Sequence, residues 1–481
     1  MAGISLPASD WRVNMNNPYA EDLKNLARFV YSHPEPGFQE EKSSHAQTEY
    51  LKSQGFEVET DLCHTHTGYR ASYGSGHPVI ALLGEFDALY GLGQKADEAM
   101  PCPDGKAMGH GCGHHMLGTA VIGAGLLIRD YLKEKGIPGT IQIYGCPGEE
   151  AGSGKAYMAR DGAFDGVDIA FSYHPSVFHQ VCTGSSQSCI SANFRFHGIA
   201  AHAAGEPQNG RSALDAVELM DVGTNYLREH MESTDRIHYA ITNTGGRSPN
   251  VVQAEAEVKY LIRSTNNRKC LALYDRVRKI AQGAALMTGT SVEILFDEGL
   301  SNTIVNFTLE DVLAEAFRKA GAPVYSEEDL AYAKKFYDTW KEPYTLDQIP
   351  YPVKDKKKLL ESEKTSVIND YFVETIHSDR CEMGSTDVGD VSYVVPTATL
   401  NTACYSYGAG AHSWQWVAEG ASEIAMKGML KGSEVLALAA ESLYEHPETV
   451  EAAKQEFAER TKDDPYQCLI PKDVMPHPIL M

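Results

Sequence analysis

The sequence predicts an α/β domain built on a mostly parallel central sheet and interrupted by a smaller α+β domain. Short apolar runs alternate with helical segments early in the chain, as in parallel sheets that are covered on both faces. A stretch near residue 255 instead alternates apolar and polar residues, which is typical of a strand with one wet face. We therefore expect residues 1–187 and 298–481 to form one domain and residues 188–297 to form the insert.

The first expected elements are two helices that precede the sheet. Apolar residues recur at helical spacing over residues 20–31, and a second helix is expected from about residue 41 to residue 53. The segment HPEPGF, residues 33–38, separates them because proline does not fit inside a helix. Gly55 is expected to end the second helix.

Continuous apolar runs predict strands that are buried in the sheet. The expected strands are VIALLG, TIQIYG and DIAFSY at residues 79–84, 140–145 and 168–173, and TATLNTACYSYG at residues 397–408. Residues 113–134 are expected to form a buried helix between the first two strands. The helical segments between strands suggest βαβ crossovers and therefore a parallel arrangement.

The insert is expected to have roughly a βαββαβ order of elements. After the segment FRFHGIAAHAA at residues 194–204, its predicted elements are a helix at 211–230, a strand at 251–263, a helix at 272–287 and a strand at 291–296. Farther along, residues 322–380 are rich in Lys, Glu, Asp and Tyr, which predicts a partly helical surface insertion.

Composition excludes several classes of protein. A formal net charge of −23 repels phosphate backbones, so nucleic acid is not an expected partner. The N-terminus lacks the basic start and apolar core of a secretory signal, and the longest small-apolar run is too short to span a bilayer. Ten cysteines without a CxxC pair fit a reducing compartment. We expect a soluble, cytoplasmic protein without a membrane partner.

Residues that bind metals or move protons follow each expected core strand. In strand order they are Glu85 and Asp87, then Cys146, Glu149 and Glu150, then His174, and finally His412. Because open α/β sheets bind ligands beyond the carboxyl ends of their strands, these residues are candidates for one site.

The glycine-rich segment around Cys112 and His114 is the sharpest of these signals. A thiolate and an imidazole together suit a zinc-like ion, and the start of the expected helix favours the thiolate. The alternative is a turn whose polar residues only cap the helix. His110 and His115 are interpreted either as supports of the site or as surface residues.

Other candidates carry structural alternatives as well. An adjacent pair such as Glu149 and Glu150 is often a solvated surface pair, but here one carboxylate can bind a metal while the other faces a substrate. His174 and His412, each taken singly, are equally compatible with structural histidines.

The order CGH, GEE, HP and HS, at residues 112–114, 148–150, 174–175 and 412–413, resembles the co-catalytic metallopeptidase family of aminoacylases, carboxypeptidases and amino-acid-conjugate hydrolases. The resemblance extends from about residue 33 to about residue 470. It implies a zinc-exopeptidase-like domain with a ferredoxin-like lid or dimerisation insert. It also implies two divalent ions per subunit, either zinc or manganese.

Roles for individual residues come from this resemblance. The implied metal ligands are Cys112, which would bridge the ions, and His114, Glu150, His174 and His412. The other implied roles are Glu149 as general base, Asp87 as the residue that orients a ligand, His202 as a residue that reaches the partner subunit's site, and Asn250 and Arg263 as substrate contacts.

The resemblance implies hydrolysis of an N-acyl amino acid, with p-aminobenzoyl-glutamate as the expected substrate. A dipeptidase or aminoacylase acting on another N-acyl or β-alanyl amino acid is an alternative, and so is a mainly structural subunit of a heteromeric hydrolase. A homodimer and a heterodimer with a homologous subunit are both compatible. Three departures from the family pattern leave the substrate open: His115 replaces a common Asp, Glu85-Phe86-Asp87 replaces a common Asp-x-Asp, and the stretch at 322–380 is longer than in short relatives.

Overall fold

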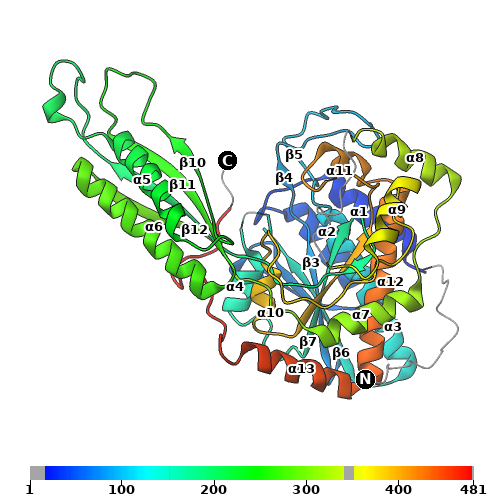
Figure 1. The fold of residues 1–481 in the computed structure, drawn as a ribbon. Coiled ribbons are helices and arrows are strands. Elements are labelled where there is room, and N and C mark those ends of the chain that lie inside the picture. The colour runs from blue at the N-terminus through cyan, green and yellow to red at the C-terminus, as the bar shows by residue number, and fades with distance from the viewer. Residues whose placement is uncertain (1–16, 151, 341–351, 409, 479–481) are drawn as a thin grey trace.

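The computed structural model describes residues 17–150, 152–340, 352–408 and 410–478 (Figure 1). The expectation about an N-terminal signal falls on residues 1–16, which lie outside the described residues. A seven-stranded sheet forms the body of the molecule. In spatial order its strands are β1 (Glu57–Thr60), β2 (Tyr69–Ser75), β6 (Gly139–Cys146), β3 (Val79–Glu85), β7 (Ile169–Ser176), β13 (Thr397–Ala403) and β8 (Gln180–Val181).

The sheet is parallel at its centre and antiparallel at its margins. Strands β6, β3, β7 and β13 pair in parallel, whereas β2 is antiparallel to β6 and β8 is antiparallel to β13. The predicted mostly parallel sheet is therefore a mixed one with a parallel core. The last predicted strand is also shorter than expected, because β13 ends at Ala403 and residues 404–408 leave the sheet.

Helices cover both faces of the sheet, which explains the continuous apolar runs. In β3, Ile80 and Leu82 pack into one hydrophobic cluster, while Ala81 and Leu83 pack into another on the opposite face. The first cluster includes helices α1 (Ala20–Ser32), α2 (Glu41–Ser53), α3 (His114–Lys135), α7 (Phe307–Ala320) and α12 (Glu423–Glu445). The second includes α4 (Gly154–Arg160) and α10 (Val388–Ser392). The predicted helices at 20–31, 41–53 and 113–134 are confirmed.

The insert extends away from the body as a separate layer of strands and helices (Figure 1). Its antiparallel sheet has the order β10 (Arg236–Asn243), β11 (Glu255–Ser264), β9 (Ser188–His197) and β12 (Ser291–Leu300). Helices α5 (Ala213–Leu227) and α6 (Asn267–Thr288) complete the βαββαβ order. Because β9 begins at Ser188 and β12 ends at Leu300, we propose these residues as the boundaries of the insert.

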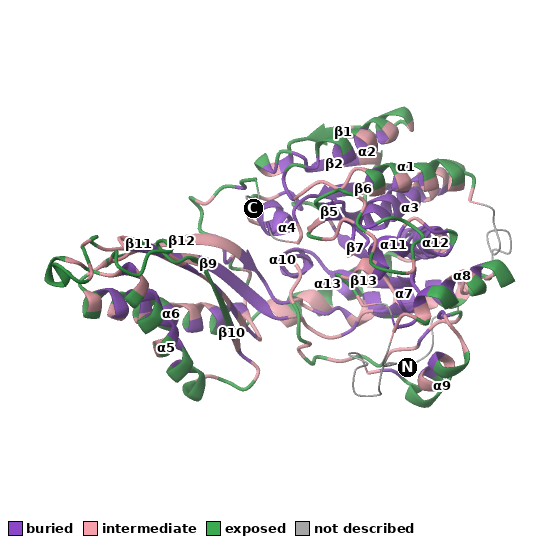
Figure 2. Cartoon of the chain, turned by 90° about the horizontal axis from the view of Figure 1, so that it is seen from above, coloured by how far each residue is buried: buried purple, intermediate pink, exposed green. Residues whose placement is uncertain are grey.

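Buried and more exposed residues alternate along β11, as expected for a strand with one solvent-facing side. The strand starts later than predicted. Ala256, Val258, Tyr260 and Ile262 are buried in the insert's own core. Residues 251–254 precede the strand, so the apolar residues among them do not extend the ladder. Figure 2 shows that exposed residues dominate the far end of the insert.

The predicted surface insertion at 322–380 needs a correction. Its helices α8 (Glu327–Tyr337) and α9 (Lys356–Thr365) exist, but Phe336, Leu359 and Ile368 are fully or almost fully buried. Its described part is therefore a packed layer of the body, and residues 341–351 lie outside the described residues. The remaining strands and α-helices of the described residues are β4 (Leu89–Tyr90), β5 (Met108–Gly109), α11 (Trp414–Glu419) and α13 (Pro447–Thr461). No helix in the described ranges is long and apolar enough to cross a membrane.

Candidate metal centre

The five residues proposed as metal ligands converge at one edge of the parallel strands. Their ligand atoms form two overlapping groups, Cys112 with His114 and His174, and Cys112 with Glu150 and His412. Within each group the atoms lie within 4.8 Å of one another. Cys112 belongs to both groups, which is the position that a bridging ligand would take.

A tight backbone turn places Cys112 beside His114. Between them, Gly113 has a φ of 83° immediately before helix α3, a left-handed conformation that strains other residues. A side chain there would also collide with the Tyr405 hydroxyl, 2.7 Å from the position of a Cβ atom. Glycine is therefore required for both side chains to reach the same site.

Asp87 fixes the orientation of two candidate ligands. Its Oδ1 lies 2.8 Å from Nδ1 of His114, and its Oδ2 accepts a hydrogen bond of 2.9 Å from the backbone N–H of Glu150. With Nδ1 donating to Asp87, Nε2 of His114 is the nitrogen that faces the site. This contact fits the orienting role that the resemblance implied for Asp87.

The other two histidines reach the site from different backbone settings. His174 lies inside β7, which continues to Ser176, rather than beyond the end of the strand as predicted. Its Nδ1 is 2.6 Å from the carbonyl of Pro175 and its Nε2 is 3.4 Å from Sγ of Cys112. His412 stands on a turn with a φ of 61°, and its Nε2 is 3.5 Å from Oε2 of Glu150.

Burial governs the protonation of the site. It raises the pKa of the Cys112 thiol well above its ordinary value, and the Glu150 carboxylate adds to the effect. In the protein without metal, burial and Glu150 therefore oppose the thiolate that was expected at the start of α3, which begins at His114. Burial, together with Glu85 and Asp387, also raises the pKa of Glu149 well above its ordinary value.

The donor set fits a divalent cation. Nε2 of His114 and Oε1 of Glu150 are buried and have no hydrogen-bond partner among the described residues. Buried polar atoms are normally satisfied, so two such atoms in one site call for a ligand. Thiolate, imidazole and carboxylate donors are those that bind zinc and similar ions.

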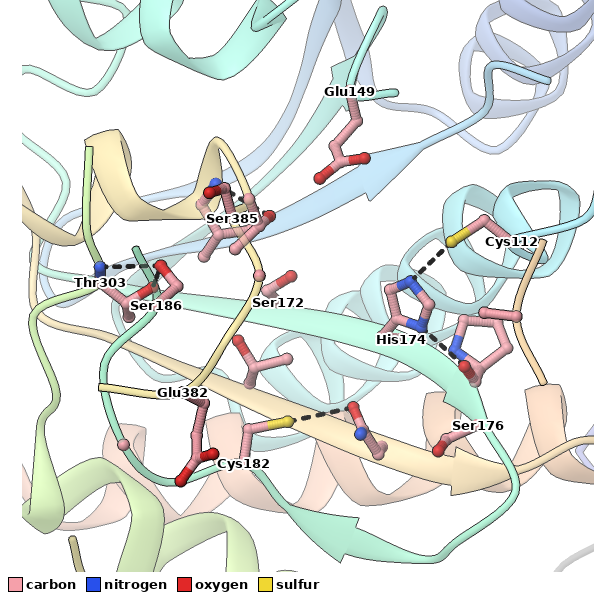
Figure 3. A pocket seen from close by; sticks show the side chains of 18 of the residues that line it. Cys112, Glu149, Ser172, His174, Ser176, Cys182, Ser186, Thr303, Glu382 and Ser385 are labelled. Atoms are coloured by element: carbon pink, nitrogen blue, oxygen red, sulfur yellow. Dashed lines mark hydrogen bonds between the residues drawn. The ribbon is translucent and has the colours of Figure 1, made fainter. Parts of the chain in front are cut away.

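A cavity of about 560 Å³ opens onto this centre. Figure 3 shows Cys112 and His174 on one side of it and Ser186 and Ser385 across from them. Glu149 also lines the cavity, so the proposed general base faces the space that a substrate would occupy. The volume is within the range of small-molecule sites.

Of the three remaining predicted residues, Arg263 lies near the cavity, whereas His202 and Asn250 lie far from it. Arg263 lies near the end of β11, where its Nη1 donates a hydrogen bond of 2.9 Å to Oγ of Ser385 in the cavity wall. His202 and Asn250 lie beyond the other end of β11 and do not line the cavity. From Glu255 to Arg263 the strand spans roughly 26 Å. A small substrate therefore cannot contact both Asn250 and Arg263 of one chain.

His110 and His115, whose roles the sequence left open, are buried behind the site. Nε2 of His110 is 3.2 Å from the carbonyl of Val30, and Nε2 of His115 is 2.8 Å from the carbonyl of Gly420. Burial lowers the pKa of His115 to about 4, so this side chain is neutral at physiological pH. Both histidines support the packing beneath helix α3.

Sequence reasoning missed the buried residues Lys155 and Asp387. Lys155 is 0% exposed, and its Nζ is 2.6 Å from Oε1 of Glu85. It also forms an ion pair with Asp387. Lysine and aspartate are usually exposed, so the only signal was their place in the segments GSGK and STDVGDVS.

The chain is similar to several known proteins. The profile of a peptidase dimerisation domain matches residues 185–286. One of the subunits of the p-aminobenzoyl-glutamate hydrolase of Escherichia coli (strain K12) is 42% identical over 460 residues, 95% of this chain and 96% of that protein. The Xaa-Arg dipeptidase of Mus musculus is 26% identical over 91% of this chain and 89% of that protein. A dinuclear metal-binding M20 peptidase from Bacillus subtilis shares the fold, with a TM-score of 0.55 at 18% identity over 89% of this chain and 99% of that one.

Proposed function

The chain belongs to the M20 family of metallopeptidases and amidohydrolases and is a metal-dependent amide hydrolase; from this premise we propose that it cleaves p-aminobenzoyl-glutamate or a closely similar N-acyl amino acid. The observation that carries the proposal is the group of donors around Cys112, with Glu149 beside it in the cavity wall. The 42% identity to a subunit of the Escherichia coli p-aminobenzoyl-glutamate hydrolase supports the choice of substrate.

We propose that Cys112, His114, Glu150, His174 and His412 would hold two divalent ions, zinc or manganese, and that Cys112, the donor common to both groups, would be available to both ions. Such ions would polarise the scissile carbonyl and lower the pKa of water. Glu149 then accepts a proton from the attacking water and delivers it to the nitrogen of the leaving amine. Its raised pKa favours the first of these transfers.

Arg263 is the proposed partner of a carboxylate on the leaving amino acid. Its side chain is half-buried and one of its nitrogens is held by Ser385 at the cavity wall. A guanidinium pairs with a carboxylate through parallel hydrogen bonds that a lysine does not reproduce. This arrangement favours an acidic or otherwise carboxylate-bearing leaving group.

Substitution of Arg263 by Ala is expected to raise KM for p-aminobenzoyl-glutamate about 10-fold or more, because a charge-assisted pair is lost. The effect on p-aminobenzoyl-glutamate amide derivatives that lack the α-carboxylate should be small. Steady-state kinetics on both substrates measure the difference, and Arg263→Lys is the matched variant that keeps the charge. Equal losses on both substrates would contradict a carboxylate contact.

We also propose that the insert forms a dimer, with a second copy or with a homologous subunit. A partner's insert would supply His202 and Asn250 to this chain's site, since its own copies lie at the far end of β11. The match of residues 185–286 to a peptidase dimerisation domain supports this arrangement.

A panel of conjugates tests the proposed substrate. The metal-loaded protein should cleave p-aminobenzoyl-glutamate with a higher kcat/KM than N-acetyl amino acids, β-alanyl dipeptides and dipeptides ending in Arg. The last group is included because the mouse relative is named an Xaa-Arg dipeptidase. A higher kcat/KM for any other member of the panel would replace p-aminobenzoyl-glutamate as the substrate while leaving the reaction class intact.

A further inference from the structure

A buried lysine stands directly behind the metal centre. Lys155, in the short helix α4, is 0% exposed, and its ammonium group contacts both Glu85 and Asp387. The backbone N–H of Lys155 also donates a hydrogen bond of 2.8 Å to Oδ2 of Asp387. The carboxylate of Asp387 therefore binds both the backbone N–H and the ammonium group of Lys155, which restricts the movement of the ammonium.

Glu85, the last residue of β3, connects this lysine to the metal centre. Its Oε1 is 2.6 Å from Nζ of Lys155, while its Oε2 is 3.2 Å from Nε2 of His114. The second contact lacks hydrogen-bond geometry, since Nε2 of His114 has no hydrogen-bond partner among the described residues. The carboxylate is thus fixed at one oxygen, and its other oxygen faces an unsatisfied nitrogen.

The tautomer of His114 determines whether its contact with Glu85 is attractive or repulsive. When the neutral ring donates its Nδ1–H to Asp87, its Nε2 carries a lone pair and no hydrogen. A lone-pair nitrogen and a carboxylate oxygen then face each other at 3.2 Å, an arrangement that a metal ion or a proton between them would stabilise. Glu85, His114 and Glu149 accordingly form a group of ligand atoms that lie within 4.8 Å of one another.

We propose that Glu85 is an additional ligand of the ion bound by Nε2 of His114, through Oε2, and that Lys155 is the positioning residue that holds Glu85 in this orientation. This inference rests on the metal centre proposed above and adds a carboxylate to its five ligands. Lys155 occupies Oε1 of Glu85, so that carboxylate binds the ion through a single oxygen. Asp387 keeps the ammonium in place through its ion pair with Lys155.

Metal binding by four variants tests the proposal. The intact protein is stripped of metal and titrated with Co²⁺, following the charge-transfer absorption of the Cys112 thiolate and the d–d bands, with bound metal measured by elemental analysis. The wild type should bind two ions. Glu85→Gln, which keeps the shape of the side chain and leaves Lys155 paired with Asp387, should weaken one binding step about 10- to 100-fold and change the d–d bands.

Lys155→Met should weaken the same step, and Lys155→Arg should restore part of the affinity because it keeps the cation. The Glu85→Gln/Lys155→Met double variant should bind metal no more weakly than Glu85→Gln alone, since Lys155 acts through Glu85. Lys454→Met is the matched control, because it removes a lysine that pairs with Asp168 away from the metal centre, and it should leave both steps unchanged.

Each contrary result has a distinct meaning. Two wild-type binding steps and unchanged d–d bands in Glu85→Gln would show that Glu85 is no ligand. An effect of Lys155→Met that adds to that of Glu85→Gln would show that the lysine only stabilises the fold. If the wild type itself binds no Co²⁺ at Cys112, the metal centre proposed above fails, and that outcome differs from a failure of Glu85 alone.

Discussion

Substitution of Glu149 by Gln is expected to lower kcat by about 10²- to 10⁴-fold, the usual contribution of a general base. Glu149 lines the cavity beside the candidate ligands; it shares a group of ligand atoms with Glu85 and His114 but belongs to neither group that contains Cys112. The amide of Gln keeps the size of the side chain and cannot accept the proton. The variant should therefore still bind two metal ions while its turnover is lost.

Turnover per bound metal measures this effect, with elemental analysis on the same samples. Glu448→Gln, on the exposed first turn of α13, is a control of the same chemistry outside the site. Wild-type kcat in Glu149→Gln would remove this residue from the reaction. Loss of a metal ion together with activity would instead make Glu149 a ligand rather than the base.

Substitution of His202 by Ala is expected to lower kcat about 10²-fold or more, the typical cost of removing a donor to a developing oxyanion. In the structure, Nδ1 of His202 accepts hydrogen bonds from the backbone N–H groups of Ala204 and Gly205, at 3.2 and 3.1 Å. The neutral ring then carries its hydrogen on Nε2. This nitrogen can therefore act as a hydrogen-bond donor from an exposed side chain. We propose that His202 donates this hydrogen bond in the active site of a partner chain.

Mixing two inactive variants tests this role across subunits. Equal amounts of His202→Ala and Glu149→Gln, dissociated and reassociated, should regain about a quarter of the wild-type activity, because half of the dimers carry one intact site. Each variant alone should stay inactive. No recovery from a mixture that contains mixed dimers would place the action of His202 within its own chain or outside the reaction.

Patterns of apolar residues predicted most of the sheet because burial on both faces leaves a direct trace in sequence. The runs at 79–84 and 140–145 became β3 and β6, and the residues after them meet at one edge of the sheet. Glycine next to Cys112 was informative for a similar reason, since only a left-handed turn brings Cys112 and His114 together.

Features that depend on packing between distant segments of the chain could not be predicted from the sequence. Nothing in the sequence shows that Lys155 is buried between Glu85 and Asp387, which lie far apart along the chain. Periodicity likewise could not place Asn250 and Arg263 at opposite ends of β11. The pKa of the Cys112 thiol could not be predicted from the helix start alone, because it also depends on burial and on Glu150.

Metal-dependent amide hydrolysis by this chain can be tested by measuring the hydrolysis of p-aminobenzoyl-glutamate by the purified protein, before and after removal of metal. We expect turnover by this chain alone, complete loss of turnover after treatment with a chelator, and recovery when zinc or manganese is restored. Absence of turnover in protein that carries two bound metal ions per chain would contradict this expectation, and would indicate a subunit that needs its homologous partner for catalysis.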